Sequence, residues 1–307
     1  MTASHVKKKI SYPARWIQSS IGNRISAVEE YLYLAAFKSK HNVRNVHRLR
    51  VASRQAMAAI VFLKEFFSPK QVAKTLELLR ILRKIAGDAR DIDVFLINHR
   101  NRDRKKTSEV DDLIGNFREK AQDPIAELAR DVRKTGLLRR RQRKLLESMK
   151  LSSVPDGKNE FLTWMRKRLF KTFRPVLQCK SNELNQLHRL HEFRVSCKRI
   201  RYTLELVSQF TTRNSYENAL ETLAQIQERL GQINDCAVAC NRIKKWEGQS
   251  SKSEKELLAK LLLQEKKKLK KELNKSSKAS AQLLVQKLQK SLKTCLKNLS
   301  SNKLAAL

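Results

Sequence analysis

One side of a predicted helix collects hydrogen-bond donors in the segment that begins at position 191. Its members are His191, Arg194, Lys198, Arg201 and Tyr202. At about 100° per residue these positions span about 100° of the helix circumference, so the five side chains leave the helix on one side. Like charges at such spacings destabilise an isolated helix by roughly 0.2–0.5 kcal/mol per pair. The pattern therefore favours binding of an anion, whose charge offsets the repulsion.

A weaker copy of this basic stripe lies 144 residues earlier in the chain, where His47, Arg50 and Arg54 share one side of a predicted helix. Met57 and Ala58 stand where the later copy has its last arginine and its tyrosine. The earlier copy therefore offers fewer donors to the same anion.

Two more arginines, Arg83 and Arg90, follow the earlier stripe on the next predicted helix. They are seven residues apart, which places them on nearly the same face. The matching positions of the later copy hold the neutral residues Gln227 and Asn234. We therefore expect both arginines to join the anion site and the two copies to contribute charge unevenly.

The two stripes belong to a longer internal repeat. Shifting the sequence by 144 residues aligns 47–94 with 191–238 without a gap and gives ten identities. This offset is nearly half of the chain, and repetition at a fixed offset indicates tandem structural units. The turn-rich cluster 152–157 separates the copies, so we predict a first repeat over 1–152 and a second over 153–307.

Composition indicates that the elements carrying these residues are helices. The chain has only 7 glycines and 5 prolines in 307 residues, while 41% of its residues are apolar. Apolar periodicity and breakers predict helices over 14–38, 43–67, 70–100, 107–149, 159–180, 183–210, 214–250, 254–273 and 279–300. Pro124 is expected to divide the fourth span. The fold class is therefore all-α, with about four helices in each half, as in a four-helix bundle.

Net charge and cysteine content limit the possible partners. The formal charge is +36, from 66 Lys and Arg against 30 Asp and Glu, so a polyanion would relieve the self-repulsion. Nucleic acid, an anionic membrane surface and inorganic polyphosphate all qualify. The five cysteines form no C-x-x-C pair, which favours reduced thiols and a cytoplasmic protein over disulfides or zinc. The sequence shows no signal peptide and no apolar run long enough to predict a transmembrane segment.

The histidine-bearing segments resemble the CHAD family, the conserved-histidine α-helical domain. Its motif is a helix reading H-x-x-R-V-x-x-[RK]-R-x-R, then L-x-x-x-L-G-x-x-R-D-x-x-V, and both parts recur in a second half. Residues 191–202 match the first part nearly completely. The first half supplies His47, Arg50, Val51 and Arg54, then Leu82, Ala86, Gly87, Arg90, Asp91 and Val94. The resemblance covers nearly the whole chain, although Gln55 and Met57 replace basic residues in the first copy.

The resemblance implies two pseudo-symmetric tandem four-helix bundles around a basic central cavity that binds polyphosphate. The partner would be inorganic polyphosphate or another linear polyanion, and the protein could associate with polyphosphate granules. Guanidinium groups bind phosphoryl oxygens bidentately, whereas Lys198 would act as a point charge and Tyr202 as a neutral donor. The arginines expected to bind in this way are Arg50, Arg54, Arg90, Arg194 and Arg201. A bound polyanion would favour the protonated forms of His47 and His191.

Other function classes receive less support from the residues. No nucleophile–base pair, phosphate loop or carboxylate cluster for Mg²⁺ can be identified, so we expect no enzyme, no cofactor and no metal site. Many relatives in the family that the chain resembles carry an appended triphosphate-hydrolysing domain with an E-x-E-x-K signature. This signature is absent from the sequence. A nucleic-acid-binding helical module is the alternative, but only 6% of residues are aromatic and they do not interleave with the basic stripe.

Several conspicuous residues are expected to be structural. Asp91 and Asp235 would each orient a neighbouring arginine, and Gly87 and Gly231 would allow close packing of helices or a kink. The basic runs 139–144 and 266–271 are typical of solvated faces, although either could guide a long anion towards the cavity. The cluster Arg166, Lys167 and Arg168 is expected at the cavity rim.

Overall fold

The computed structural model describes residues 11–38, 43–101, 108–180, 187–275 and 278–299. Within these ranges the regular structure is helical apart from one isolated bridge, which confirms the all-α prediction. The helices are α1 (Tyr12–Phe37), α2 (Val43–Leu63), α3 (Pro69–Arg100), α4 (Ser108–Lys120), α5 (Asp123–Thr135), α6 (Leu137–Glu147), α7 (Lys158–Leu177), α8 (Leu187–Val207), α9 (Arg213–Glu247), α10 (Lys252–Lys275) and α11 (Lys278–Lys297).

Local sequence explains where the helices begin and end. Proline occupies the first turn of α1, α3 and α5, where its fixed φ suits a helix start and its missing N–H costs nothing. The span predicted as one helix over 107–149 is three helices, because Pro124 opens α5 and Gly136 ends it. Gly136 has φ 58°, the left-handed conformation that glycine adopts at a helix end.

The internal repeat is visible in the element boundaries. Helix α8 begins 144 residues after α2, and α9 begins 144 residues after α3. A short 3₁₀ turn follows each first member, Lys64–Phe66 after α2 and Ser208–Phe210 after α8, again at this offset. The identities found in the sequence therefore mark equivalent positions on equivalent helices.

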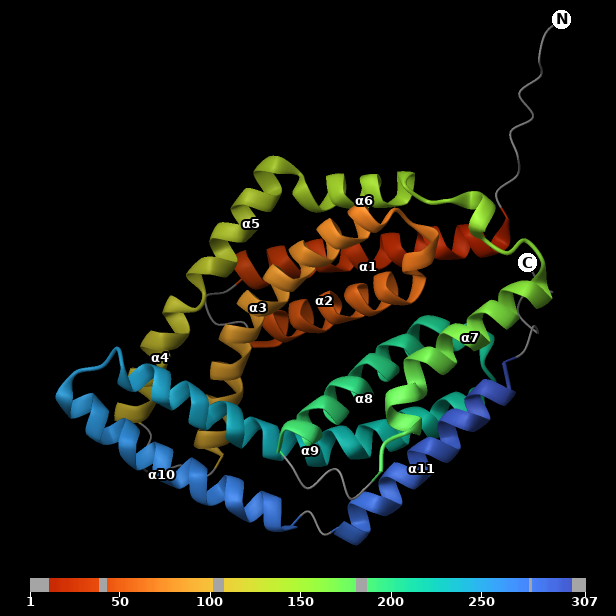
Figure 1. Ribbon diagram of the computed structural model, residues 1–307. Coiled ribbons are helices and arrows are strands. Elements are labelled where there is room, and N and C mark those ends of the chain that lie inside the picture. Colours follow the sequence, from red (N-terminus) through yellow and green to blue (C-terminus); the bar gives the residue numbers. More distant parts are fainter. Residues whose placement is uncertain (1–10, 39–42, 102–107, 181–186, 276–277, 300–307) are drawn as a thin grey trace, which may run out of the picture.

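The helices form two groups (Figure 1). In the first group α1, α2 and α3 pack together, with α5 and α6 against α1. In the second group α7, α8, α9 and α11 pack together, and α10 runs along α9. The groups meet where α2 contacts α8 and α3 contacts α9, so the equivalent helices of the repeat face each other.

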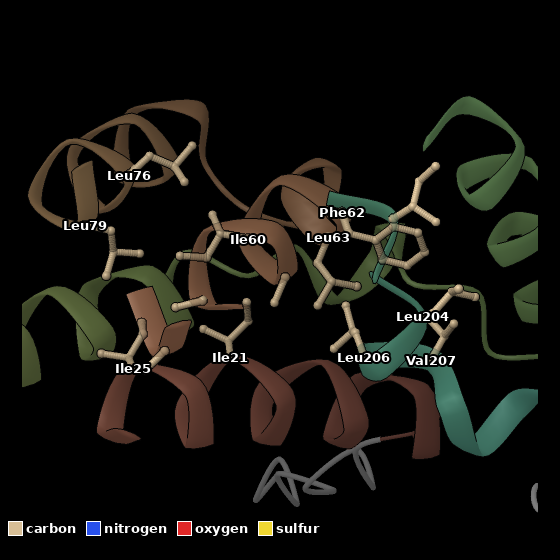
Figure 2. Packing of buried hydrophobic residues seen from close by; sticks show 14 of the residues in the cluster. Ile21, Ile25, Ile60, Phe62, Leu63, Leu76, Leu79, Leu204, Leu206 and Val207 are labelled. Atoms are coloured by element: carbon tan, nitrogen blue, oxygen red, sulfur yellow. The ribbon is translucent and has the colours of Figure 1, made fainter. Parts of the chain in front are cut away.

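One apolar core continues through both groups. Figure 2 shows part of it, where side chains of α1, α2 and α3 lie near those of α8. Trp16 of α1 packs edge-to-face on Phe161 of α7 at 5.7 Å and on Phe210 at 5.1 Å between ring centroids. Such pairs contribute about 0.5–1.5 kcal/mol beyond the area they bury. The core thereby holds the two groups in a fixed relation.

A second, smaller core fixes α10. Leu258 and Leu261 of α10 are buried with Ile243 and Trp246 of α9 and with apolar side chains of α3 and α4. Leu273, near the end of the helix, is 37% exposed. The leucines that α10 contributes to this core all lie in its first half.

A buried ion pair and its hydrogen bonds connect α3, α4 and α1. Asp93 of α3 accepts a 2.6 Å hydrogen bond from Arg118 of α4, and their side chains are 2% and 3% exposed. Arg118 also donates to Gln122 at 3.0 Å, and Gln122 donates to the carbonyl of Ala35 near the end of α1 at 2.7 Å. Because removal of one partner leaves the other charge uncompensated, this pair is sensitive to single substitutions.

We expect Arg118→Met to lower the free energy of unfolding by about 3–5 kcal/mol in urea denaturation, because the Asp93 carboxylate stays buried without its counter-charge. Adding Asp93→Leu should restore most of the loss, since well-packed apolar residues often replace a buried pair without penalty.

The matched control is Arg100→Met at the end of α3. Arg100 is 58% exposed and pairs with Asp111 at 2.7 Å, so its loss should cost less than about 1 kcal/mol. Equal losses of unfolding free energy in Arg118→Met and Arg100→Met would show that the buried pair contributes no more to stability than the exposed one.

Candidate functional site

A cavity of about 380 Å³ lies where α2, α3, α8 and α9 meet, and α10 contributes to one side of it. Basic side chains dominate its polar lining, with seven Arg or Lys residues and a histidine against four carboxylates. The basic residues are His47, Arg50, Arg54, Arg90, Arg194, Lys198, Arg201 and Lys268. The carboxylates are Asp91, Glu205, Asp235 and Glu265. The cavity thus carries an excess of positive charge.

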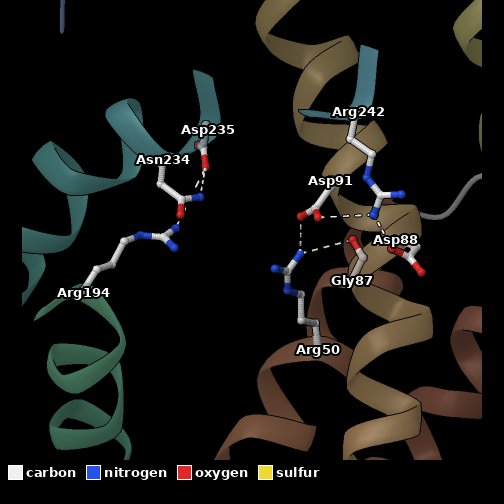
Figure 3. Close-up of polar contacts among 8 residues, drawn as sticks. All are labelled: Arg50, Gly87, Asp88, Asp91, Arg194, Asn234, Asp235 and Arg242. Atoms are coloured by element: carbon white, nitrogen blue, oxygen red, sulfur yellow. Dashed lines mark hydrogen bonds and ion pairs between the residues drawn. The ribbon is translucent and has the colours of Figure 1, made fainter. Parts of the chain in front are cut away.

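The wall formed by α2 and α3 is held by ion pairs (Figure 3). Arg50 donates to Asp91 at 2.6 Å and to the carbonyl of Gly87 at 3.3 Å. Arg242 of α9 pairs with Asp88 and lies 3.5 Å from the other oxygen of Asp91. Two arginines and two aspartates therefore neutralise one another, and they fix the direction of Arg50.

The equivalent wall of α8 and α9 is less completely paired. Arg194 lies 4.0 Å from Asp235, at the limit of an ion pair (Figure 3). The Nε of Arg194 is buried without a hydrogen-bond partner. Gln227 accepts a bond from Arg201 at 3.2 Å, yet its own Nε2 is also buried and unpartnered. Since buried donors are normally satisfied, this wall has donors available to a ligand.

The cations of α2 and α8 lie close enough to perturb one another. Burial lowers the pKa of Lys198 from 10.5 to about 7, assisted by repulsion from the neighbouring Arg54 and Arg194. Burial also lowers the pKa of Arg54, with repulsion from Arg50, while Tyr202 opposes the shift by a hydrogen bond. The two basic stripes thus face a shared space.

His47 belongs to the same group of positive charges. Burial lowers its pKa, and repulsion from Arg90, Arg50 and Arg54 lowers it further. In the absence of an anion the imidazole is therefore harder to protonate than a free histidine. An anion among these groups would act in the opposite direction.

Glu205 closes the cavity at the end of the α8 stripe. It accepts hydrogen bonds from Gln55 of α2 at 2.9 Å and from Arg201 at 3.0 Å. This carboxylate thereby joins α2 to α8.

Eight of the ten sequence-predicted site residues line this cavity. They are His47, Arg50, Arg54, Arg90, Arg194, Lys198, Arg201 and Tyr202. His191 is exposed and lines a neighbouring pocket between α8 and α9 with His188. Arg83 is exposed on α3 and is not part of the lining. It shares a face with Arg90 but lies about 10 Å away along the helix axis, at 1.5 Å per residue.

Sequence reasoning missed or misplaced several residues. Lys268 and Glu265 of α10 line the cavity, and the sequence carries a signal only for Lys268, through the basic run 266–271. The cluster expected at the rim lies elsewhere. Arg168 donates to the carbonyls of Phe62 and Val61 and so caps α2, and Arg166 donates to the carbonyl of Leu296.

The structural roles expected for the aspartates and glycines hold in part. Asp91 orients Arg50, as predicted, and Asp235 lies beside Arg194 at a longer distance. A Cβ at Gly87 would lie 3.8 Å from Arg50, an ordinary contact, and one at Gly231 would meet nothing within 4 Å. The prediction of close helix packing is therefore wrong at Gly231.

Other kinds of site are not evident in the described part of the chain. No three or more His, Cys, Asp or Glu residues there are grouped to hold a metal ion. None of the five cysteines forms a disulfide, and Cys236 and Cys240 are buried. None of the described helices has the length and apolar character needed to span a membrane.

Comparisons with known proteins agree with this architecture. A family model described as CHAD domain matches residues 26–244. The crystal structure of the CHAD domain from the plant Ricinus communis is similar, with a TM-score of 0.69, 19% sequence identity and 92% of each chain covered. At this identity the structural likeness shows the fold alone. No curated protein matches the sequence.

The lowered pKa of Lys198 predicts a pH-dependent stability. The folded protein disfavours the charged amine, so the destabilisation is absent above the usual pKa of 10.5, grows as the pH falls, and is complete below about 7. We therefore expect Lys198→Met to raise the melting temperature near neutral pH without added anion. The gain should shrink as the pH rises to about 9.

Lys198→Arg is the control, because it keeps the charge at every pH tested and should give no gain. Thermal unfolding followed by circular dichroism measures both variants. A Lys198→Met protein less stable than the wild type near pH 7 would contradict the inference that the charge of Lys198 destabilises the folded protein.

Proposed function

The chain belongs to the CHAD family, and we propose that it binds inorganic polyphosphate in the cavity between its two helix groups, without chemical conversion. The observation that supports this most directly is the approach of Arg54, Arg194 and Lys198 from facing helices with too few carboxylates to neutralise them. A phosphate polymer would supply the missing negative charge.

The donor types in the cavity suit phosphoryl oxygens. Guanidinium groups bind two oxygens at once, and such charge-assisted bonds are about twice as strong as neutral ones. Donors come from five helices, so successive phosphoryl groups of one chain would meet successive side chains. The unpartnered Nε of Arg194 and Nε2 of Gln227 would bond to a ligand without breaking an existing contact.

The lining favours polyphosphate over nucleic acid, the alternative partner. Its aromatic residues are Phe95 and Tyr202. The Phe95 ring packs against Trp246 and His99, which leaves only Tyr202 among the lining aromatics to stack on a base. Recognition of single-stranded nucleic acid usually relies on several such platforms. A ligand without bases suits this lining better.

Binding without catalysis suits the carboxylates of the cavity. Asp91 is engaged by Arg50 and Arg242, and Glu205 accepts from Arg201 and Gln55. Residues held in this way orient cations and are poorly placed to activate water or to bind Mg²⁺ for phosphoryl transfer. Their role would be to keep the cationic side chains in position for the polymer.

The tandem arrangement would give each repeat one wall of the site. We propose two pseudo-symmetric bundles, over 1–152 and 153–307, whose equivalent helices α2 and α8 face each other across the cavity. The shared offset of the helix starts supports this division. We place the eight lining residues in the site and leave Arg83 outside it. We expect His191 to contact polyphosphate only when the polymer extends past α8.

A cytoplasmic location, with possible granule association, follows as part of the same proposal. The five cysteines form no disulfide, which suits a reducing compartment. Association with polyphosphate granules would require no further contact if the cavity holds part of a longer polymer.

Substitution of single arginines tests the proposed site. We expect Arg54→Gln and Arg194→Gln each to weaken binding of long-chain polyphosphate by about tenfold to a hundredfold, as for lost charge-assisted bonds of about 1.5–3 kcal/mol. Arg83→Gln removes the same charge outside the cavity and should change the affinity less than about twofold. Isothermal titration at several salt concentrations measures all three variants.

DNA of equal total charge is the competing ligand in the same titrations. We expect it to bind more weakly than polyphosphate and to respond equally to Arg54→Gln and Arg83→Gln, as a surface contact would. Equal affinity for the two polymers, or equal losses of polyphosphate affinity in Arg54→Gln and Arg83→Gln, would overturn the proposed function.

A further inference from the structure

Helix α10 contributes to the cavity although it lies outside the part of the chain that the family model matches. That match ends at residue 244, whereas α10 spans Lys252–Lys275 and adds Glu265 and Lys268 to the lining. The first half of α10 is anchored by Leu258 and Leu261 in the smaller core. This anchoring places the second half of the helix at the edge of the cavity.

A shallow depression lies on the solvent-facing side of α10, at the level of the cavity residue Lys268. It is lined by Lys267, Lys270, Lys271 and Asn274. Lys267 precedes the cavity residue Lys268 directly, and Lys271 follows it by three residues, about 4.5 Å along the helix axis. The lysines of the depression are therefore within one helical turn of the cavity lining.

Charge along this part of α10 is not balanced within the helix. No Asp or Glu stands three or four positions from Lys267, Lys270 or Lys271, although lysines occupy several of those positions. Each like-charge pair at these spacings costs roughly 0.2–0.5 kcal/mol. An anion along this side of the helix would offset the repulsion, as in the cavity.

The other basic run differs in this respect. In α6, Arg139 lies 3.2 Å from Glu29 and Arg143 lies 3.8 Å from Glu147. The depression beside them is also lined by Glu29, Glu30 and Glu147. Carboxylates already accompany that run, so a polyanion would be repelled as well as attracted there.

We propose that the outer lysines of α10, Lys267, Lys270 and Lys271, form a second contact segment for the polyanion held in the cavity. This inference rests on the proposed function. A short phosphate chain fills the cavity alone, whereas a long chain passes Lys268, turns about 60° around the helix to Lys271 and continues over the outer lysines of α10. The protein thereby binds long chains more tightly than short ones through a part of the molecule that short chains do not reach.

The test compares tripolyphosphate with long-chain polyphosphate on a triple variant, K267Q/K270Q/K271Q. We expect long-chain affinity to fall at least about tenfold. The salt dependence should become shallower by about two to three released counterions, as for lost phosphate contacts. Affinity for tripolyphosphate should stay within about twofold of the wild type, because the cavity lining is unchanged.

The matched control is K287Q/K290Q/K293Q on α11, which removes three exposed lysines and the same net charge. It should leave the ratio of long-chain to short-chain affinity unchanged, and unfolding midpoints of both variants verify that they fold. The proposal would be overturned if the ratio of long-chain to short-chain affinity fell no further in the α10 variant than in the α11 control.

Failure of the proposed function gives a different result. In that case Arg54→Gln would leave tripolyphosphate binding intact, or the wild-type protein would bind neither phosphate ligand. If the cavity variants lose both ligands while the α10 variant behaves like its control, the site stands and the role of α10 fails.

Discussion

Mutual repulsion among cations at the meeting of α2 and α8 is the constraint on which the structure depends. Arg54, Arg194 and Lys198 are partly buried there, and the lowered pKa of each shows that burial opposes its charge. The apolar core offsets this cost by packing the two groups together through Trp16, Phe161 and Phe210. The fold thus tolerates local destabilisation in order to hold an unneutralised site open.

The two walls of the cavity meet this constraint differently. Arg50 is fixed by Asp91, which Arg242 also approaches, so its direction is set before any ligand arrives. Arg194 has only a 4.0 Å approach to Asp235 and an unpartnered Nε. One repeat therefore provides a preorganised wall and the other a wall that a ligand would complete. This asymmetry agrees with the uneven charge of the two copies.

Periodicity predicted which face of a helix each residue occupies, but it could not predict how far along the axis the helices cross. Arg83 and Arg90 share a face, yet only Arg90 reaches the cavity. The lining of α2 runs from His47 to Gln55, whereas that of α8 runs from Arg194 to Glu205, which leaves His191 outside. The place of Lys268 in the cavity lining depends on where α10 packs. That position is set by apolar contacts with α3, α4 and α9, and residues of α3 and α4 are distant in the sequence.

A crystal structure of the protein with bound polyphosphate tests the central claim most directly. We expect the polymer to lie between α2 and α8, with its oxygens on the guanidinium groups of Arg54 and Arg194 and on the amine of Lys198. Phosphate density confined to outer faces, such as the α6 run at 139–144, with the space between α2 and α8 left without ligand, would contradict the account.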